Sequence, residues 1–286
     1  MRLSVFLFAA MTLAGAQAPT GNIEARSIEV HGHRGARAVR PENTIAAFSY
    51  AIGQGVDYLE LDMAVTKDNV LVVSHDPHLH GPVCSGPVAD AAIHSLTLAE
   101  VRQWECGVGN PAFPRQEKIP GTRVPTLDEV FALAPRGNFK FNIETKIFAD
   151  HPELTPSPEE FAKLVLSMVR KHHLESRVVL QSFDFRTLHA MKQLAPEIVR
   201  VALYEGQPKD FVAIAREADA TVISPYYKLV TAEQVRAAHA AGLQVVPWTP
   251  NAPEEWDALI AAGADAIITD DPAALLAVLR ARRLHP

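Results

Sequence analysis

Hydrophobic and polar positions alternate most clearly over residues 57–77, which read DYLELDMAVTKDNVLVVSHDP. In the first half, every second side chain is apolar, which predicts a strand with one buried face. Glu60 and Asp62 fall between the apolar positions, so both carboxylates should point to the opposite face. A turn around Asp68 sends the chain back, and a hairpin centred just before Asp68 brings His75 opposite Glu60, within one or two residues. The pattern therefore predicts that two acids and a histidine converge.

The rest of the chain predicts strands and helices in alternation. Further strands are expected over residues 28–31, 138–145, 177–181, 198–203, 221–224, 243–248 and 266–269. Helices are expected over residues 45–54, 126–133, 158–172, 185–194, 208–217, 232–241, 253–262 and 272–283. Together with the first arm of the hairpin this makes eight strands, which is typical of a (β/α)8 TIM barrel, so we expect one such domain over residues 26–286. An open doubly wound sheet fits less well, because no G-x-G-x-x-G turn follows a strand.

Residues 78–122 interrupt the alternation. Proline and glycine are frequent there, and only a short helix over residues 97–104 is expected. A long irregular segment inside a compact domain is unusual unless it is functional, so we interpret it as a small insertion after the hairpin that borders a site. It holds both cysteines of the chain, Cys84 and Cys106, and either a disulfide or two separate thiols fits the sequence.

The N-terminus has the pattern of a targeting segment. Arg2 precedes an apolar run over residues 3–15, which leads into small-residue motifs of the A-x-A type. This predicts a signal peptide over residues 1–18, cut after Ala16 or Ala18, and export to the periplasm or the medium. An uncleaved membrane anchor is the alternative. No other stretch approaches transmembrane length, so no stable membrane insertion is expected after cleavage.

Composition narrows the class of partner. The 286-residue chain carries a formal net charge of −6 and has a sequence pI of about 6.1. A nucleic-acid-binding protein normally presents a basic face, and no cluster of lysine or arginine offsets the acidic balance. We therefore expect a small-molecule partner and no nucleic acid.

Candidate reactive groups follow the predicted strands at their C-terminal ends, where barrel enzymes place their active sites. They are His33, Arg34, Glu60, Asp62, His75, Glu144, Lys146, Gln181, Trp248 and Asp270. Three carboxylates without a cysteine suit one hard divalent cation, Ca²⁺ or Mg²⁺. A guanidinium and an ammonium group beside them suit a phosphate, and two histidines suit proton transfer in both directions. Any one of these residues could be structural, but their convergence predicts metal-assisted cleavage of a phosphate ester.

Eight short motifs give this prediction a family context. They are His33-Arg34-Gly35, Pro41-Glu42-Asn43-Thr44, Glu60-Leu61-Asp62, Thr66-Lys67-Asp68, His75-Asp76-Pro77, Glu144-Thr145-Lys146, Gln181-Ser182-Phe183 and Trp248-Thr249. In this order, from about residue 29 to residue 272, the chain closely resembles the glycerophosphodiester phosphodiesterase (GDPD) family. The early motifs are specific in combination, whereas the last ones are weak alone.

The resemblance implies a role for each residue of the site. His33 and His75 would be the general acid and base, and Glu60, Asp62 and Glu144 would bind the divalent metal. The residues implied to hold the phosphate or the substrate are Arg34, Lys146, Gln181 and Trp248. The implied reaction hydrolyses deacylated phospholipid diesters to sn-glycerol 3-phosphate and an alcohol. In the implied route the glycerol 2-hydroxyl attacks phosphorus, and water then opens the cyclic phosphate.

Three other functions are compatible with parts of the sequence. His31 and His33 with Asp270 also fit the H-x-H pattern of metal-dependent amidohydrolases, but Tyr204 and Ser224 stand where that class needs further histidines. A related barrel phospholipase acting on lysophospholipid or sphingomyelin-type substrates would need an apolar insertion, and residues 78–122 hold few large apolar side chains. A non-catalytic binding protein fits poorly with an intact set of acids, bases and histidines.

Two features depart from the family pattern. The residues after Trp-Thr are 250–253, PNAP, where small apolar residues are usual, and the end of the eighth strand, residues 269–272, TDDP, has an acid where an aromatic residue is common. His31 is an additional histidine on the same face as His33, for which we expect core hydrogen bonding rather than catalysis. The sequence leaves open the alcohol head group, the choice between Ca²⁺ and Mg²⁺, which histidine is the base, and the oligomeric state.

Overall fold

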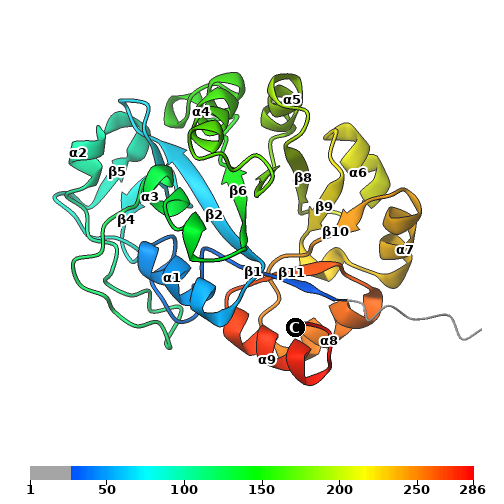
Figure 1. The fold of residues 1–286 in the computed structure, drawn as a ribbon. Helices are drawn as coiled ribbons and strands as arrows, with labels where there is room; N and C mark the ends of the chain where they lie inside the picture. Colours follow the sequence, from blue (N-terminus) through cyan, green and yellow to red (C-terminus); the bar gives the residue numbers. More distant parts are fainter. Residues whose placement is uncertain (1–26) are drawn as a thin grey trace, which may run out of the picture.

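Eight parallel strands form the centre of the molecule, and helices surround them (Figure 1). The computed structural model describes residues 27–286, so the predicted signal peptide over residues 1–18 lies outside the described residues. The strand order is β10-β9-β8-β7-β6-β2-β1-β11. The strands are β1 (Glu29–Gly32), β2 (Tyr58–Val65), β6 (Lys140–Thr145), β7 (Val178–Ser182), β8 (Val199–Tyr204), β9 (Val222–Pro225), β10 (Gln244–Val245) and β11 (Ala266–Thr269). The predicted (β/α)8 TIM barrel is confirmed.

The barrel closes between its last two strands through one isolated bridge and a further hydrogen bond from the Asp265 N–H to the Val245 carbonyl. Trp248 pairs with Ile268 in parallel orientation, and the Ile268 N–H donates to the Pro247 carbonyl over 3.0 Å. Strand β10 itself contains only two residues, whereas the sequence predicts a strand over residues 243–248. Backbone hydrogen bonds to β9 nevertheless continue from Val246 and Trp248, whereas Pro247 has no N–H to donate toward β11.

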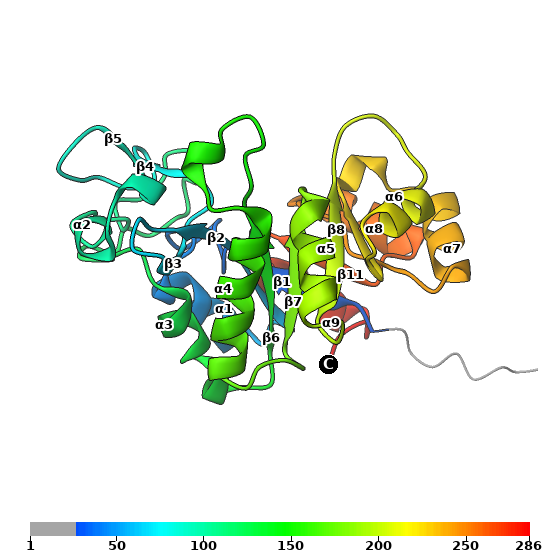
Figure 2. The same ribbon diagram turned by 90° about the horizontal axis from the view of Figure 1, so that it is seen from above.

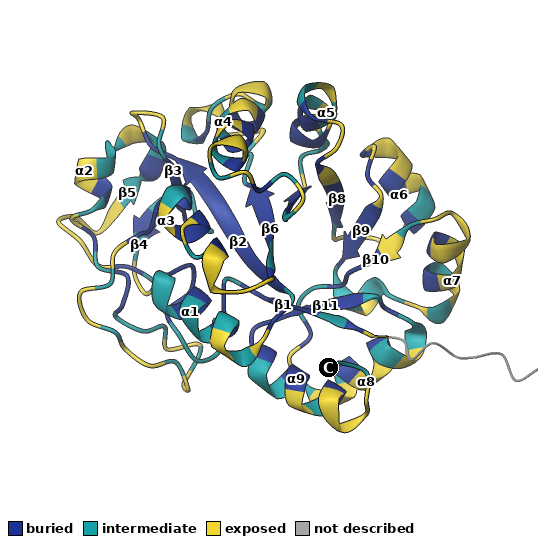
Figure 3. Cartoon of the chain, viewed as in Figure 1, coloured by how far each residue is buried: buried dark blue, intermediate teal, exposed yellow. Residues whose placement is uncertain are grey.

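The helices lie on the outside of the barrel, with their buried residues toward the strands and their exposed residues outward (Figure 3). They are α1 (Ile45–Gln54), α2 (Leu98–Val101), α3 (Leu127–Phe131), α4 (Pro158–Lys171), α5 (Phe185–Leu194), α6 (Phe211–Glu217), α7 (Ala232–Ala240), α8 (Pro253–Ala262) and α9 (Pro272–Ala281). Short 3-10 turns lie at Ile93–Ser95, Ala134–Arg136, Pro152–Leu154 and Tyr227–Leu229. Within residues 27–286, no helix combines the length and the apolar character needed to span a bilayer.

Alternation along β2 divides the core into two layers. Leu59, Leu61 and Met63 are fully buried and belong to the large cluster between strands and helices, which also contains Phe48 and Phe141. Side chains of the other face point into the barrel, where a smaller cluster forms its lower filling: Tyr58, Val179, Val201, Val222, Val246, Ala266 and Ile268. A strand with two buried faces thus carries carboxylates on the inner one.

The hairpin register differs by one residue from the prediction. In the antiparallel pairing of β2 with β3 (Leu71–Val73), Met63 lies opposite Val73. The turn holds three residues between Thr66 and Val70, whose backbones are hydrogen-bonded, so the hairpin is centred on Asp68 rather than between Lys67 and Asp68. The Ser74 N–H consequently donates to the backbone carbonyl of Asp62 over 3.0 Å. Ser74 therefore lies opposite Asp62, and His75, the next residue, is one position away from the predicted place opposite Glu60, within the margin of one or two residues.

The insertion has more regular structure than the sequence suggested. Strands β4 (His78–His80) and β5 (Asp90–Ala92) form an antiparallel pair, and helix α2 is shorter than the predicted 97–104. Of the two alternatives for the cysteines, the structure contains the Cys84–Cys106 disulfide. These elements lie beside β2 and β3 in two perpendicular views (Figures 1 and 2).

The insertion packs around a second hydrophobic cluster, which it shares with Ala64 of β2 and Val72 of β3. Leu79, Ile93 and Trp104 are buried there with the disulfide. Gly86 is required by this packing, because a Cβ at that position would lie 2.2 Å from the indole of Trp104. Although the insertion contains few large apolar residues, most of them are buried in this cluster and together form its core.

Candidate active site

All nine residues predicted for the site line one pocket at the C-terminal ends of the strands. They are His33, Arg34, Glu60, Asp62, His75, Glu144, Lys146, Gln181 and Trp248. Arg37, Phe183, Leu203, Thr249 and Ile268 complete the lining. The barrel topology accounts for the convergence, because each contributing segment ends or follows a strand at the same rim.

Three buried carboxylates form the centre of the pocket. Glu60 and Asp62 project from β2 and Glu144 from the neighbouring β6, where Asp62 and Glu144 are paired in register. One oxygen of each lies within 4.8 Å of the others. Burial, followed by Asp62, raises the pKa of Glu60 well above its ordinary value, and burial raises the pKa of Glu144 to about 7. A buried, all-oxygen donor set of this kind fits a hard divalent cation.

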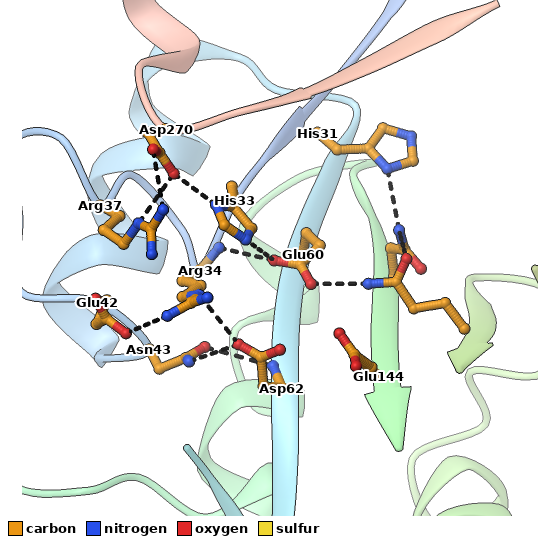
Figure 4. Close-up of polar contacts among 12 residues, drawn as sticks. His31, His33, Arg34, Arg37, Glu42, Asn43, Glu60, Asp62, Glu144 and Asp270 are labelled. Carbon is orange, nitrogen blue, oxygen red and sulfur yellow. Dashed lines mark hydrogen bonds and ion pairs between the residues drawn. The ribbon is translucent and has the colours of Figure 1, made fainter. Parts of the chain in front are cut away.

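Asp62 differs from the other two acids because cations and amides surround it. Lys146 Nζ lies 3.2 Å from Asp62 and 2.7 Å from Glu144. Arg34 Nε lies 3.4 Å from Asp62, and the Asn43 amide donates to it over 2.9 Å (Figure 4). Burial alone would raise the pKa of Asp62, but Lys146 first and then its other neighbours hold it well below the ordinary value. The pocket therefore combines one firmly ionised acid with two that retain protons more readily.

Arg34 connects the first strand to the acids through both backbone and side chain. Its N–H donates to Glu60 over 2.8 Å, and its guanidinium donates to Glu42 over 2.6 Å. This geometry needs a left-handed backbone at Arg34, with φ of 50°, followed by Gly35 with φ of 84°. At Gly35 a Cβ would lie 2.7 Å from the side chain of Ala47, so glycine is required. The His-Arg-Gly motif is thus a backbone requirement as well as a chemical one.

His33 is oriented by Asp270 at the end of β11. Its Nδ1 lies 2.5 Å from Asp270, whose carboxylate also accepts two bonds of 3.1 Å from Arg37 and one of 2.8 Å from Asn251. The carboxylate accepts, so Nδ1 carries the proton and Nε2, 4.0 Å from Glu60, is the free nitrogen. Burial lowers the pKa of His33 to about 4 although Asp270 opposes the shift, so the imidazole is neutral at pH 7.

His75 is the more exposed of the two histidines. Its Nδ1 lies 2.9 Å from Asp76, and 35% of its side chain is accessible, against 10% for His33. It follows β3 and precedes the insertion, so it reaches the pocket from the side. Both histidines therefore have an aspartate at Nδ1, which leaves Nε2 of each available for proton transfer.

Several residues that hold the site together were given no role in the predicted phosphodiesterase site. Asp270 was a candidate only at the end of the eighth strand, Glu42 and Asn43 stood only within a motif, and no role was predicted for Arg37 or Asn251. The Pro-Glu-Asn-Thr motif was a signal for Glu42 and Asn43, since both contact residues of the pocket. For Asp270 the signal was its position directly after the eighth predicted strand, since the first and eighth strands of a barrel are neighbours and His33 directly follows the first.

His31 lies apart from the pocket. It stacks on Tyr58 at 4.1 Å between ring centroids, and its Nδ1 lies 3.3 Å from the Asn142 amide. Core hydrogen bonding, as expected, accounts for it, and it is not among the residues that line the pocket with His33. The H-x-H geometry of an amidohydrolase is therefore not formed.

Fold and site together define a (β/α)8-barrel enzyme with acids, cationic groups and paired histidines at the mouth of the barrel. The chain belongs to the glycerophosphoryl diester phosphodiesterase family, whose model matches residues 33–274. The expected family and the expected enzyme class, a phosphodiesterase hydrolase, are thereby confirmed.

Individual relatives agree with the family over nearly the whole described chain. A glycerophosphodiester phosphodiesterase of Caldanaerobacter subterraneus is 35% identical over 251 residues, which cover 88% of this chain and 97% of that protein. A crystal structure from Silicibacter pomeroyi, named as a candidate glycerophosphoryl diester phosphodiesterase, has a TM-score of 0.85 and 31% identity, covering 91% and 95% of the two chains. A phosphodiesterase of Oleispira antarctica, solved in complex with the product sn-glycerol-3-phosphate, shares the fold with a TM-score of 0.76 at 24% identity, covering 88% and 96%.

Metal affinity should depend on pH through the raised pKa of Glu144. Below about pH 7 this carboxyl takes up a proton in the metal-free protein, and a cation must then displace it. We expect the affinity for Ca²⁺ or Mg²⁺, measured by titration calorimetry, to fall by up to about tenfold per pH unit as the pH decreases from about 7. Glu144→Gln should bind more weakly and with a flatter pH profile. A wild-type affinity that stays constant over this range would contradict the prediction.

Proposed function

We propose that this phosphodiesterase uses one divalent cation, Ca²⁺ or Mg²⁺, to hydrolyse glycerophosphodiesters to sn-glycerol 3-phosphate and an alcohol. The observation that carries the proposal is one pocket in which three buried carboxylates lie beside two cationic side chains and two aspartate-oriented histidines. The Oleispira relative, which binds sn-glycerol-3-phosphate, supports the choice of substrate.

In this proposal the acids and the cationic side chains have separate tasks. Glu60, Asp62 and Glu144 bind the cation, which supplies Lewis-acid polarisation of a phosphoryl oxygen when bound. Arg34 and Lys146 bind phosphate oxygens, since each already lies against the acid cluster and retains donors for an anion. Neutralisation of the phosphate charge on both sides lowers the cost of attack by an electron-rich oxygen.

The two histidines move the protons. One Nε2 takes the proton from the glycerol 2-hydroxyl as its oxygen bonds to phosphorus, and the other gives a proton to the departing alcohol oxygen as the P–O bond breaks. The resulting cyclic phosphate is opened by water with the proton transfers reversed, which restores both histidines. Asp270 and Asp76 keep the histidines in the required tautomer through their contacts with Nδ1. Gln181 and Trp248 contribute to the walls around the substrate.

A soluble, deacylated substrate is favoured over a lysophospholipid or a sphingomyelin. A phospholipase of this fold would need apolar side chains on the insertion to contact a membrane. Within residues 78–122 Trp104 and Leu79 are buried, and Val88 is the large hydrophobic residue of that segment that is exposed. Phe113 is half-buried, with the Arg37 guanidinium 4.6 Å above its ring.

Hydrolysis and metal dependence can be tested on the mature protein with a panel of glycerophosphodiesters that differ in head group. We expect release of sn-glycerol 3-phosphate, loss of activity in excess chelator, and recovery when Ca²⁺ or Mg²⁺ is added back. An enzyme-coupled assay for glycerol 3-phosphate measures both effects. Undiminished activity in excess chelator would eliminate the metal role, and turnover restricted to acylated lipids would favour the phospholipase.

Removal of either histidine should slow the reaction strongly. His33→Ala and His75→Ala should each reduce kcat by roughly 10²–10⁴-fold, because each removes one proton-transfer group. His78→Ala is a matched control, since His78 lies near His75 on β4 but is absent from the lining of the active-site pocket. A wild-type kcat for either His33→Ala or His75→Ala would refute the assignment.

We also propose that the protein is exported to the periplasm or the medium, with residues 1–18 as its signal peptide. The disulfide of the insertion is consistent with an oxidising compartment. After expression of the full chain in a bacterial host, the exported protein should begin at Gln17 or Pro19, as read by mass spectrometry of the intact chain. Full-length protein retained with the membrane fraction would favour the uncleaved anchor.

A further inference from the structure

A row of buried polar side chains runs from the barrel interior to the acid cluster. The Gln181 amide donates to Glu60 over 2.8 Å, and the Asn142 amide donates to Gln181 Oε1 over 3.0 Å. The same Asn142 nitrogen lies 3.3 Å from Nδ1 of His31. Figure 4 shows this row extending from Glu60 to His31, on the side away from Arg34. Four side chains from strands β1, β2, β6 and β7 are thereby joined across the barrel.

We propose that Asn142, supported by His31, is a positioning residue that fixes the Gln181 amide and thereby the carboxylate of Glu60. The proposal rests on the proposed function, in which Glu60 is a metal ligand. Asn142 is fully buried and is not among the residues that line the active-site pocket. It therefore acts through Gln181 and not through contact with substrate.

When Glu60 is ionised, as a metal ligand must be, donor and acceptor chemistry allows only one polarity for this row. Glu60 accepts the Arg34 N–H at one carboxylate oxygen, and at the other it accepts a hydrogen bond from the Gln181 amide nitrogen. The Gln181 oxygen then faces Asn142, and only the amide nitrogen of Asn142 can donate a hydrogen bond to it. That nitrogen also faces Nδ1 of His31, which must accept, so the proton of a neutral His31 is on Nε2.

His31 is held in a state that suits this role. Its ring stacks on Tyr58 with an interplanar angle of 23° and is almost completely buried. Burial, followed by the charge of Lys140, lowers the pKa of His31 to about 3, so the ring remains neutral and Nδ1 remains an acceptor. A protonated His31 would present an N–H to the Asn142 amide and reverse the polarity.

Strand register explains why Asn142 occupies this position. It lies opposite Glu60 in the pairing of β2 with β6, and it precedes Glu144 by two residues. Side chains two residues apart on a strand share a face, so Asn142 lies one layer below Glu144 in the barrel. Gln181, which lies opposite Glu144 on β7, bridges the two layers.

The test replaces Asn142 with residues of similar size that either accept hydrogen bonds in place of donating them or form none. Asn142→Asp replaces the donor by an acceptor, so Gln181 must rotate and direct its oxygen at Glu60, where no hydrogen bond forms. Loss of an outer partner of a metal ligand typically costs 10–100-fold in metal affinity, and we expect a loss of that size for Ca²⁺ and Mg²⁺ chloride titrated into the mature protein by calorimetry. Asn142→Leu removes the donor without adding an acceptor, and should lose less.

A control separates positioning from stability. Ser224 is also fully buried on a barrel strand, where its hydroxyl donates to the Val246 carbonyl over 2.6 Å without a link to Glu60. Ser224→Ala should lower the melting temperature but leave metal affinity within about twofold of wild type, because no outer partner of a ligand is lost. In the Asn142 variants, the metal concentration for half-maximal activity should rise while the substrate KM at saturating metal stays close to wild type.

Each outcome decides between the alternatives. A folded Asn142→Asp with wild-type metal affinity, or a Ser224→Ala that loses as much affinity, overturns the positioning role. If Asn142→Asp does not fold, the same comparison is made with Asn142→Leu, and wild-type affinity in that variant also overturns it. A wild-type protein that binds neither cation refutes the proposed metal role itself, which is distinguishable because the wild type is titrated first.

Discussion

Mutual repulsion among three buried carboxylates is the constraint on which the rest of the structure depends. Glu60, Asp62 and Glu144 are almost inaccessible to water and share a volume only a few ångströms wide. Removal of a carboxylate from water costs several kcal/mol unless partners compensate, and three like charges add to that cost. The neighbouring side chains are therefore best understood as compensation that leaves the acids ready for a cation.

The cationic side chains compensate the charges of the three carboxylates unevenly, so the three acids differ in how readily they ionise. Asp62 receives the cationic groups, whereas Glu60 receives only neutral N–H donors as its hydrogen-bond partners, from the Arg34 backbone and from Gln181. Neutral donors orient a carboxylate without cancelling its charge. The negative charge of an ionised Glu60 therefore remains uncompensated, and a divalent cation can neutralise it. Lys146 is shared between Asp62 and Glu144, which places a cation where phosphate oxygens would also approach.

The sequence predicted correctly those features that depend on the alternation of side chains along a strand or on the position of a residue at a strand end. The alternation along residues 58–65 correctly predicted inward-facing Glu60 and Asp62, and the barrel then brought all nine predicted residues to one pocket. It was less accurate where geometry depends on three-dimensional partners. The hairpin register changed by one residue because the turn holds three residues, and the insertion formed a packed unit around Trp104 that no periodicity reveals. The contact of His33 with Asp270 joins the first and last strands, which pair side by side in the sheet although they lie at opposite ends of the sequence.

The two histidines are attached to different parts of the fold. His33 is buried on the barrel and fixed by Asp270, which Arg37 and Asn251 hold in turn. His75 is half-exposed on the segment that leads into the insertion, and its partner Asp76 lies 3.5 Å from His80 of β4. Changes in the insertion can therefore reach the pocket on two sides. One is His75, and the other is Arg37, whose guanidinium lies 4.6 Å from the Phe113 ring and whose carbonyl accepts a hydrogen bond from Gln116. The residues proposed to bind metal and phosphate lie on or directly after the barrel strands β1, β2 and β6, so the insertion can vary around His75 without replacing any of them.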